Sequence, residues 1–266
     1  MSFEGKNIVI TGASSGIGKA AAVKFAKKGA KIALVARRQK KLEQVEDELK
    51  SLGAATLVCR CDISDKSQVK AMHKAVLERF GPADVLVNNA GFAIYGSVSE
   101  LTIDEIESQM NTNYLGMVYC TKHFLPDMLK KGSGHIVNVA SVAASFGLPG
   151  IASYCASKFA MLGFSEGLLH ELKGTGVRIT VVSPIMVRTD FFDHPSFTAM
   201  PRSSSMSISA ETVAGAVLKA ARSHRLEIIV PQIIRGAVWT KHTLPFLINP
   251  IVGSVFQRQL DAARKE

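Results

Sequence analysis

The sequence predicts a single α/β domain over residues 1–266, built as a doubly wound parallel sheet with helices on both faces. Apolar, strand-like runs alternate with helix-like stretches from the N-terminus to about residue 190, which is the pattern of consecutive β-α-β units. The apolar runs are nearly continuous in Val, Ile and Leu, as expected of strands that helices cover on both faces. No tandem repeat or low-complexity linker divides the chain, so one domain accounts for it.

Glycines mark the ends of the first helical stretches. The helical stretch after the first strand ends at Gly29, and the helical stretch after the second strand ends at Gly53. A break is expected inside the long helical stretch at 102–129. The six strands are expected at 6–11, 31–37, 55–62, 83–91, 134–144 and 177–185. The helices between them are expected at 18–29, 38–53, 64–81, 102–129 and 153–176.

The regular pattern loosens beyond Asp190. Residues 191–209 mix aromatic residues with proline and a serine run, which indicates a loop with one or two short helices. We therefore expect a substrate loop at about 190–210. A helix returns over 209–227, with Ser209 as its N-cap and Glu211 in its first turn. A last strand is expected at 226–231, and an apolar, basic tail occupies 236–266.

The formal net charge of +10 favours anionic partners or reflects a solvated basic face. Nucleic-acid binding is not expected, because no groove motif that mixes aromatic and basic residues accompanies the charge. The four cysteines form neither a CxxC pair nor a cluster typical of a metal site, so no metal is expected. The N-terminus lacks the pattern of a signal peptide, and no apolar run is long enough to span a bilayer. These features predict reduced thiols and a cytoplasmic protein.

Three glycines lie between the first apolar run and the first helix. A turn of this kind lets backbone N–H groups face a phosphate, and the helix N-terminus adds partial positive charge. Gly12 would make the tight turn, Gly16 would allow close approach, and Gly18 would allow the helix to pack on the strand. The alternative is a turn made for packing alone. Because the glycines follow a strand and open a helix, a nucleotide site is favoured.

The spacing of these glycines is Thr11-Gly12-x-x-x-Gly16-x-Gly18, and it resembles that of the short-chain dehydrogenase/reductase family. Further motifs follow in the family's order: Asn-Asn-Ala-Gly after the fourth strand, Asn113, Ser141 after the fifth strand, and Tyr154 with Lys158 in Tyr-Cys-Ala-Ser-Lys. The resemblance covers residues 5–190. It implies a single-domain Rossmann fold that binds NAD(H) or NADP(H).

Tyr154 and Lys158 lie one helical turn apart and so share a helix face. When a hydride reaches a carbonyl carbon, negative charge develops on the oxygen and a proton must be donated there; Tyr154 is the expected acid. An ammonium beside a phenol favours tyrosinate and so lowers the pKa of the phenol. Lys158 is expected to supply this ammonium. The Ser141 hydroxyl can stabilise the substrate oxygen. By resemblance, Lys158 also holds the nicotinamide ribose and Asn113 holds a water for proton relay. A lone Tyr–Lys pair at this spacing would favour a surface pair, and only the ordered set of motifs favours the catalytic role.

Arg37 and Arg38 end the second strand, where an acid would indicate NAD(H). A guanidinium suits a 2′-phosphate, so NADP(H) is predicted over NAD(H). The alternative is that both arginines point to solvent. By resemblance, Asp62 contacts the adenine and Thr189 lies near the nicotinamide carboxamide. The residues expected to bind the cofactor are Gly12, Ser14, Ser15, Gly16, Ile17, Gly18, Arg37, Arg38, Asp62, Ile63, Asn89, Ala90, Gly91, Tyr154, Lys158 and Thr189.

One position departs from the family pattern, because Ile185 follows Pro184 where a glycine is usual. Backbone freedom is lost there, and the nicotinamide pocket is expected to have a different shape. An apolar substrate is expected, such as a ketone, aldehyde or alcohol, although the same aromatic residues could be core. The residues expected to line its pocket are Phe146, Leu148, Phe191, Phe192 and Phe197.

Two functions remain open at the level of sequence: an NADP(H)-dependent oxidoreductase, and a non-enzymatic NADP(H)-sensing protein on the same fold. The complete set of four catalytic candidates favours the enzyme. By resemblance, the helices around Asn113 and Tyr154 form subunit contacts, which predicts a homodimer or homotetramer. The tail at 236–266 could rest on a membrane, or it could pack on a sister subunit or cover the pocket, and packing is favoured.

Overall fold

The structure is a computed structural model that describes residues 2–200, 207–244 and 246. Seven parallel strands form one sheet in the order β3-β2-β1-β4-β5-β6-β9. Their bounds are β1 Asn7–Thr11, β2 Lys31–Ala36, β3 Thr56–Arg60, β4 Val85–Asn88, β5 Gly134–Val139, β6 Val177–Pro184 and β9 Glu227–Val230. The order reverses direction between β1 and β4, as in a doubly wound sheet, and the predicted fold class is confirmed.

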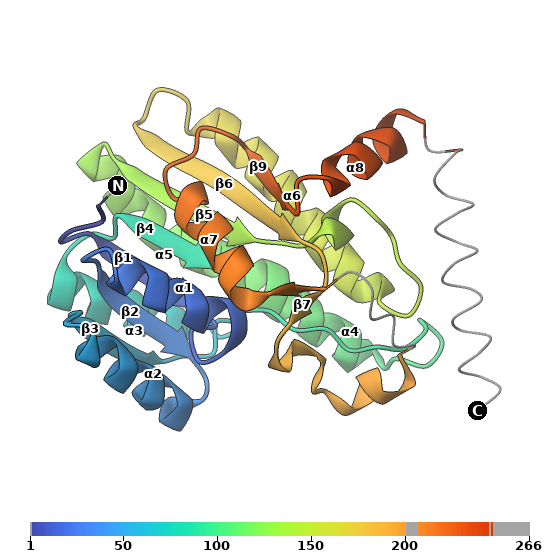
Figure 1. Cartoon of the computed structure of the whole chain (residues 1–266), viewed down its shortest axis with the longest axis horizontal. Coiled ribbons are helices and arrows are strands. Elements are labelled where there is room, and N and C mark those ends of the chain that lie inside the picture. Colours follow the sequence, from blue (N-terminus) through green and yellow to red (C-terminus); the bar gives the residue numbers. More distant parts are fainter. Residues whose placement is uncertain (1, 201–206, 245, 247–266) are drawn as a thin grey trace.

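The helices divide between the two faces of the sheet (Figure 1). One apolar core joins the sheet to α1, α2 and α7, and a second joins the opposite face to α3, α5 and α6. Their bounds are α1 Gly16–Ala26, α2 Gln39–Ser51, α3 Lys66–Phe80, α5 Gly116–Lys131, α6 Ala152–Glu171 and α7 Ala210–Ala220. In β1, Ile8 and Ile10 belong to the first core and Val9 to the second, which explains why the strands carry continuous apolar runs.

The expected break in the helical stretch at 102–129 is a change of helix type. Helix α4 (Ile103–Met110) runs into a π-helical turn at Asn111–Leu115, and α5 follows without a gap. The turn carries Asn113 into the interior, where its side chain is fully buried. π-helical turns inside longer helices are frequent at functional sites.

The segment after β6 forms the predicted loop with short helices. Two 3₁₀ helices lie at Asp190–Phe192 and Pro195–Ala199. Two-residue strands β7 (Val187–Arg188) and β8 (Ile208–Ser209) pair in parallel, and this bridge joins the two ends of the loop. Ser209 caps α7 as expected, because its hydroxyl accepts from the backbone N–H of Thr212.

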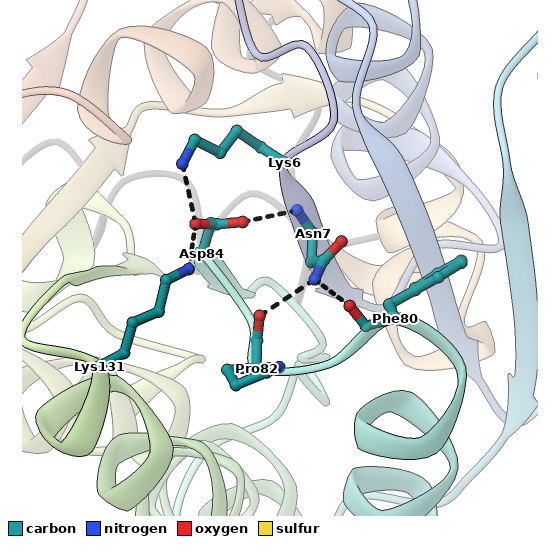
Figure 2. A network of polar contacts seen from close by, with 6 residues as sticks. All are labelled: Lys6, Asn7, Phe80, Pro82, Asp84 and Lys131. Carbon is teal, nitrogen blue, oxygen red and sulfur yellow. Dashed lines mark hydrogen bonds and ion pairs between the residues drawn. The ribbon is translucent and has the colours of Figure 1, made fainter.

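At the amino edge of the sheet, Asp84 connects three elements (Figure 2). Its carboxylate accepts the backbone N–H of Asn7 at 2.9 Å and ion-pairs with Lys6 at 3.2 Å and Lys131 at 2.5 Å. The Asn7 amide nitrogen donates in turn to the backbone carbonyls of Phe80 and Pro82. These contacts fix the starts of β1 and β4 at the edge opposite the carboxyl ends of the strands.

Candidate active site

A cleft of about 850 Å³ opens at the carboxyl edge of the sheet, beside the segments that follow β1, β2, β3, β4, β5 and β6. This is where ligands bind in open α/β sheets. The residues predicted from sequence that line it are Gly12, Ser14, Ser15, Gly16, Ile17, Arg37, Arg38, Asp62, Ile63, Asn89, Ala90, Gly91, Ser141, Tyr154, Lys158 and Thr189. Two predicted residues, Gly18 and Asn113, are not part of the described lining.

The turn after β1 needs its glycines for two different reasons. Gly12 has φ +67°, and a Cβ built on it would come within 2.8 Å of the Ala90 backbone. Gly16 has φ +53°, and its Cβ would lie 3.1 Å from the Thr189 side chain. Both conformations favour glycine, and both positions leave the cleft free of side-chain atoms. Backbone therefore forms the floor of the cleft here, which fits the close approach of a phosphate.

Gly18 faces away from the cleft. A Cβ on it would lie 2.2 Å from the Gly12 carbonyl oxygen, so this glycine lets α1 pack directly on the turn. Its predicted packing role is therefore consistent with the structure, whereas it makes no contribution to the described cleft wall.

The Asn-Asn-Ala-Gly segment is bonded to the glycine turn. The Thr11 hydroxyl accepts the backbone N–H groups of Asn89 and Ala90 at 3.0 and 3.1 Å. The Asn89 side chain donates to the carbonyls of Thr11 and Gly12 at 3.0 and 3.3 Å. The exit of β4 and the exit of β1 are thus held as one rigid unit. Asn89 therefore lines the cleft and also holds the backbone of the glycine turn in place.

Arg37 and Arg38 lie at the start of α2, beside the glycine turn. The Arg38 guanidinium donates to the hydroxyls of Ser14 at 3.0 Å and Ser15 at 2.8 Å. Arg37 lies 3.8 Å from the Asp62 carboxylate, and its side chain is 66% exposed. Both arginines are solvent-exposed, and Arg38 is in addition held on the serines of the glycine turn, so its role as a phosphate ligand stays a prediction. This corner of the cleft offers two guanidinium groups and two hydroxyls to an anion.

Tyr154 and Lys158 come from the first turns of α6 and are both buried against the cleft. The Lys158 ammonium lies 5.6 Å from the centre of the Tyr154 ring and donates to the Val139 carbonyl at 3.1 Å. Tyr154 is hydrogen-bonded to the Ser141 side chain. The structure thus brings together three of the four predicted catalytic residues, from the end of β5 and one face of α6.

Burial sets the protonation of this group. It raises the pKa of Tyr154 well above its usual value, and the hydrogen bond with Ser141 acts in the opposite direction. Burial also lowers the pKa of Lys158 to about 7. The phenol is therefore a proton donor at neutral pH. The lysine is poised to change charge in the physiological range, as is frequent for groups at functional sites.

Buried polar side chains attach α6 to the sheet through Ser165, which lies about three helical turns after Tyr154 and so on the same face of the helix. The Asn88 amide donates to Asn138 at 2.9 Å, and the Asn138 amide donates to the Ser165 hydroxyl at 2.9 Å. Ser165 donates to the Met161 carbonyl at 2.7 Å, within the same helix. These bonds link β4, β5 and α6. They set the rotation of α6 about its axis, and with it the direction of Tyr154.

Asn113 lies behind the cleft wall. Its side-chain oxygen accepts the Phe92 N–H at 2.9 Å, and its nitrogen donates to the Phe92 carbonyl and to Ser157 at 2.9 and 3.0 Å. A Cβ on Gly91 would lie 3.0 Å from the Asn113 oxygen and 3.5 Å from the Lys158 ammonium, so Asn113 is near Lys158. Its side-chain amide is already paired within the protein, and the proton relay stays a prediction.

The substrate side of the cleft is aromatic. Phe191 packs edge-on against the Tyr154 ring at 5.6 Å, and Phe192 and Phe197 contact each other at 5.1 Å. Leu148 also lines the cleft, as expected, but Phe146 does not, which corrects that prediction. The Phe146 ring instead lies under the ammonium of Lys241, 5.6 Å away. The hydrophobicity of Phe146 alone gave no sign of the direction in which its side chain points.

Sequence reasoning missed Tyr95 and several smaller apolar residues of this wall. Tyr95 follows the Asn-Asn-Ala-Gly segment, and its backbone N–H donates to Ser196 of the substrate loop at 2.9 Å. Its place just beyond a strand end was the available signal. Ile185 also lines the cleft, so the residue that replaces the family glycine does reach the pocket. Within residues 2–200, 207–244 and 246, no cluster of His, Cys, Asp and Glu suits a metal ion.

Comparison with known proteins identifies the family to which this doubly wound sheet belongs. The model of the short chain dehydrogenase family matches residues 6–196, and the chain belongs to that family. Ketoacyl reductase HetN of Nostoc is 36% identical over 228 residues, which cover 86% of this chain and 79% of that protein.

Two solved structures share the fold over most of the chain. A short-chain dehydrogenase/reductase from Burkholderia phymatum in complex with NAD has a TM-score of 0.84 and 30% identity, covering 93% of this chain and 96% of its own. An alcohol dehydrogenase from Thermococcus sibiricus complexed with 5-hydroxy-NADP has a TM-score of 0.75 and 29% identity, covering 85% of this chain and 95% of its own. The predicted family is confirmed.

Proposed function

We propose that this protein is an NADP(H)-dependent oxidoreductase that transfers a hydride between the nicotinamide and an apolar carbonyl or alcohol substrate. The observation that carries the proposal is the buried pair of Tyr154 and Lys158, with Ser141 beside Tyr154, in a cleft whose other end is the glycine turn. The relatives named above include a ketoacyl reductase and an alcohol dehydrogenase, which act on the same class of functional group.

The residues present fit a dinucleotide. The side-chain-free floor at Gly12 and Gly16 suits the pyrophosphate, and the guanidinium groups of Arg37 and Arg38 suit a 2′-phosphate. Asp62 and Ile63 would contact the adenine, and Thr189 the carboxamide end. When bound, the nicotinamide cofactor supplies or accepts the hydride. Because the solved relatives hold NAD in one case and an NADP derivative in the other, the preference for NADP(H) rests on the two arginines.

In the reducing direction, the Tyr154 hydroxyl donates its proton to the substrate oxygen as negative charge develops there. The Ser141 hydroxyl donates a hydrogen bond to the same oxygen. Lys158 in its ammonium form stabilises the tyrosinate left behind and binds the ribose, and Asn113 completes the path for the returning proton. The aromatic wall of Phe191, Phe192 and Phe197 excludes water and favours an apolar substrate.

Replacing Tyr154 by Phe tests the acid directly. Removing a general acid lowers turnover by about 10²–10⁴-fold. Cofactor affinity, measured by quenching or by calorimetry, should change less than about threefold, because the ring remains. Tyr119→Phe on α5 is the control, since Tyr119 lies outside the described cleft wall. Unchanged turnover in Tyr154→Phe would remove Tyr154 from the mechanism. If the wild-type chain binds NADPH but reduces nothing in a screen of ketones and aldehydes, the alternative of a sensing protein is supported.

Replacing Arg37 by Asp together with Arg38 by Ala tests the cofactor. Each lost charge-assisted contact weakens binding by about 1.5–3 kcal/mol, so NADPH affinity should fall by about 10²-fold or more while NADH affinity is retained. The control, Lys27→Asp with Lys28→Ala, makes the same change in net charge at two exposed positions just beyond the far end of α1. If both variants keep the preference for NADPH, the arginines are not phosphate ligands.

Homodimer or homotetramer formation through α5 and α6, and a cytoplasmic location, are parts of the same proposal. Light scattering after gel filtration measures the assembly, and a monomer at micromolar concentration would contradict it.

A further inference from the structure

Helix α8 (Ile234–Thr243) follows β9 and lies at the edge of the molecule (Figure 1). Its residues separate into two faces. Ile234, Val238 and Lys241, spaced by four and three residues, are buried or half-buried against the body. Arg235, Trp239 and His242 have the same spacing and are exposed, so they form a neighbouring face, about 100° around the helix, that is turned to solvent. This outer face therefore combines a large aromatic side chain with the guanidinium of Arg235.

Lys241 anchors the inner face. Its ammonium lies 5.6 Å from the ring centres of both Phe146 and Phe159, which come from the loop after β5 and from α6. Cation–π contacts of this kind hold the helix against the body in one rotation. Trp239 is consequently kept pointing outward, with 64% of its surface exposed.

Three of the five most exposed large apolar residues in the described ranges belong to this helix or its ends. Ile233 is 84% exposed and Phe246 is 68% exposed, at the two ends of α8. No residue from 207 to 244 lines the described part of the cleft, so α8 does not cover the pocket. Large exposed apolar groups that gather on one element mark an interaction surface.

The charge of the segment indicates whether a second copy of the chain or a membrane surface covers α8. Residues 228–260 contain no Asp or Glu, whereas Arg235, Lys241 and Arg258 are cationic. Arg235 lies on the exposed face of α8, and Lys241 is held against the body. Two copies of such a helix repel each other, but an anionic surface attracts it. No helix in the described ranges is long and apolar enough to cross a bilayer. We propose that α8, with Ile233 and Phe246, docks the protein on the surface of an anionic phospholipid bilayer, with Trp239 inserted at the headgroup level.

Trp239 is the only tryptophan of the chain, so its fluorescence reports on α8 alone. We expect a blue shift on adding vesicles of phosphatidylcholine mixed with phosphatidylglycerol, together with co-sedimentation. The shift should be weaker with phosphatidylcholine alone and should decrease with added salt. A shift that depends on protein concentration and is independent of lipid would mean that a second copy covers α8, and would overturn the proposal.

Matched variants distinguish docking through α8 from nonspecific adsorption of exposed apolar residues to vesicles. Ile233→Ser with Trp239→Ser should lower the partition coefficient onto mixed vesicles at least tenfold. The control is Val98→Ser with Ile103→Ser, because these side chains are 63% and 69% exposed but lie near the start of α4. Arg235→Glu keeps the tryptophan and should weaken both the blue shift and the co-sedimentation. Equal partition of the two double variants would refute the docking surface, whatever the catalytic activity of the protein.

Discussion

Asp84 offers a test of what holds the amino edge of the sheet together. Its side chain is 15% exposed and receives one backbone N–H and two ammonium groups (Figure 2). Asp84→Asn keeps the shape and an oxygen for the Asn7 N–H, but that bond loses its charge assistance, which halves its strength. The two lysines lose their partner at a smaller penalty, because their side chains are 54% and 35% exposed and can turn to water. We expect a loss of about 2 kcal/mol in the free energy of unfolding. In a domain of this size, that lowers the melting temperature by about 4–8 °C.

The pH dependence gives the same prediction a second readout. Burial raises the pKa of Asp84, but the bonds from Lys131, Asn7 and Lys6 outweigh it, so the pKa in the folded state is below the ordinary value. Such a group stabilises the fold fully above the pKa of the unfolded chain, about 3.9, and loses this contribution as the pH falls through the lower folded pKa. In urea titrations, the difference in the free energy of unfolding between wild type and Asp84→Asn should be constant from pH 7 to 5 and should disappear below about pH 4. The control is Asp47→Asn, which changes an exposed carboxylate of α2. If Asp84→Asn loses no more unfolding free energy at pH 7 than Asp47→Asn does, the stabilising role of Asp84 is refuted.

Two further predictions concern the site itself. Gly18→Ala should destabilise the fold by about 1–3 kcal/mol in urea titrations, because the new methyl group would collide with the Gly12 carbonyl. Gly215→Ala in α7, where nothing lies within 4 Å of a Cβ, should instead gain up to about 1 kcal/mol, and equal effects would contradict the packing role of Gly18. Lys158→Met should stabilise the protein by about 1–4 kcal/mol at pH 7 while abolishing turnover, because it removes a buried charge. The unfolded chain keeps the Lys158 proton between pH 7 and about 10.4 whereas the folded chain releases it, so wild-type stability rises over this range. The difference in the free energy of unfolding between wild type and Lys158→Met should therefore narrow as the pH approaches 10. A constant difference would contradict the assigned pKa of Lys158.

The fold could be predicted from sequence because each element carries its own local signal. The run Asn7–Thr11 is wholly apolar or small except at its ends, and such runs occur in a parallel sheet covered on both faces. The π-helical turn at Asn111–Leu115 had no comparable signal, because its residues fit an ordinary helix equally well. The short pairing of β7 with β8 joins residues 187–188 to 208–209, and no local pattern specifies a contact over that separation.

The candidate site could be predicted wherever backbone geometry restricts the residue type. Gly12 and Gly16 need positive φ, and Tyr154 and Lys158 need one helical turn between them. The direction of a side chain in an irregular loop has no such restriction. Leu148 and Phe146 are both apolar and lie two residues apart in the same loop, yet one lines the cleft and the other supports α8. Their hydrophobicity alone predicted the same place for both.

The amide chain from Asn88 through Asn138 to Ser165 attaches α6 to the sheet by the same helix face that carries Tyr154. The backbone that carries Tyr154 is therefore anchored in the interior of the sheet, while its ring also packs against Phe191 of the substrate loop. The rest of that loop can then be exchanged between relatives, altering which molecules are accepted, while Phe191 keeps its place beside the proton donor. This separation makes the scaffold a suitable host for grafted specificities.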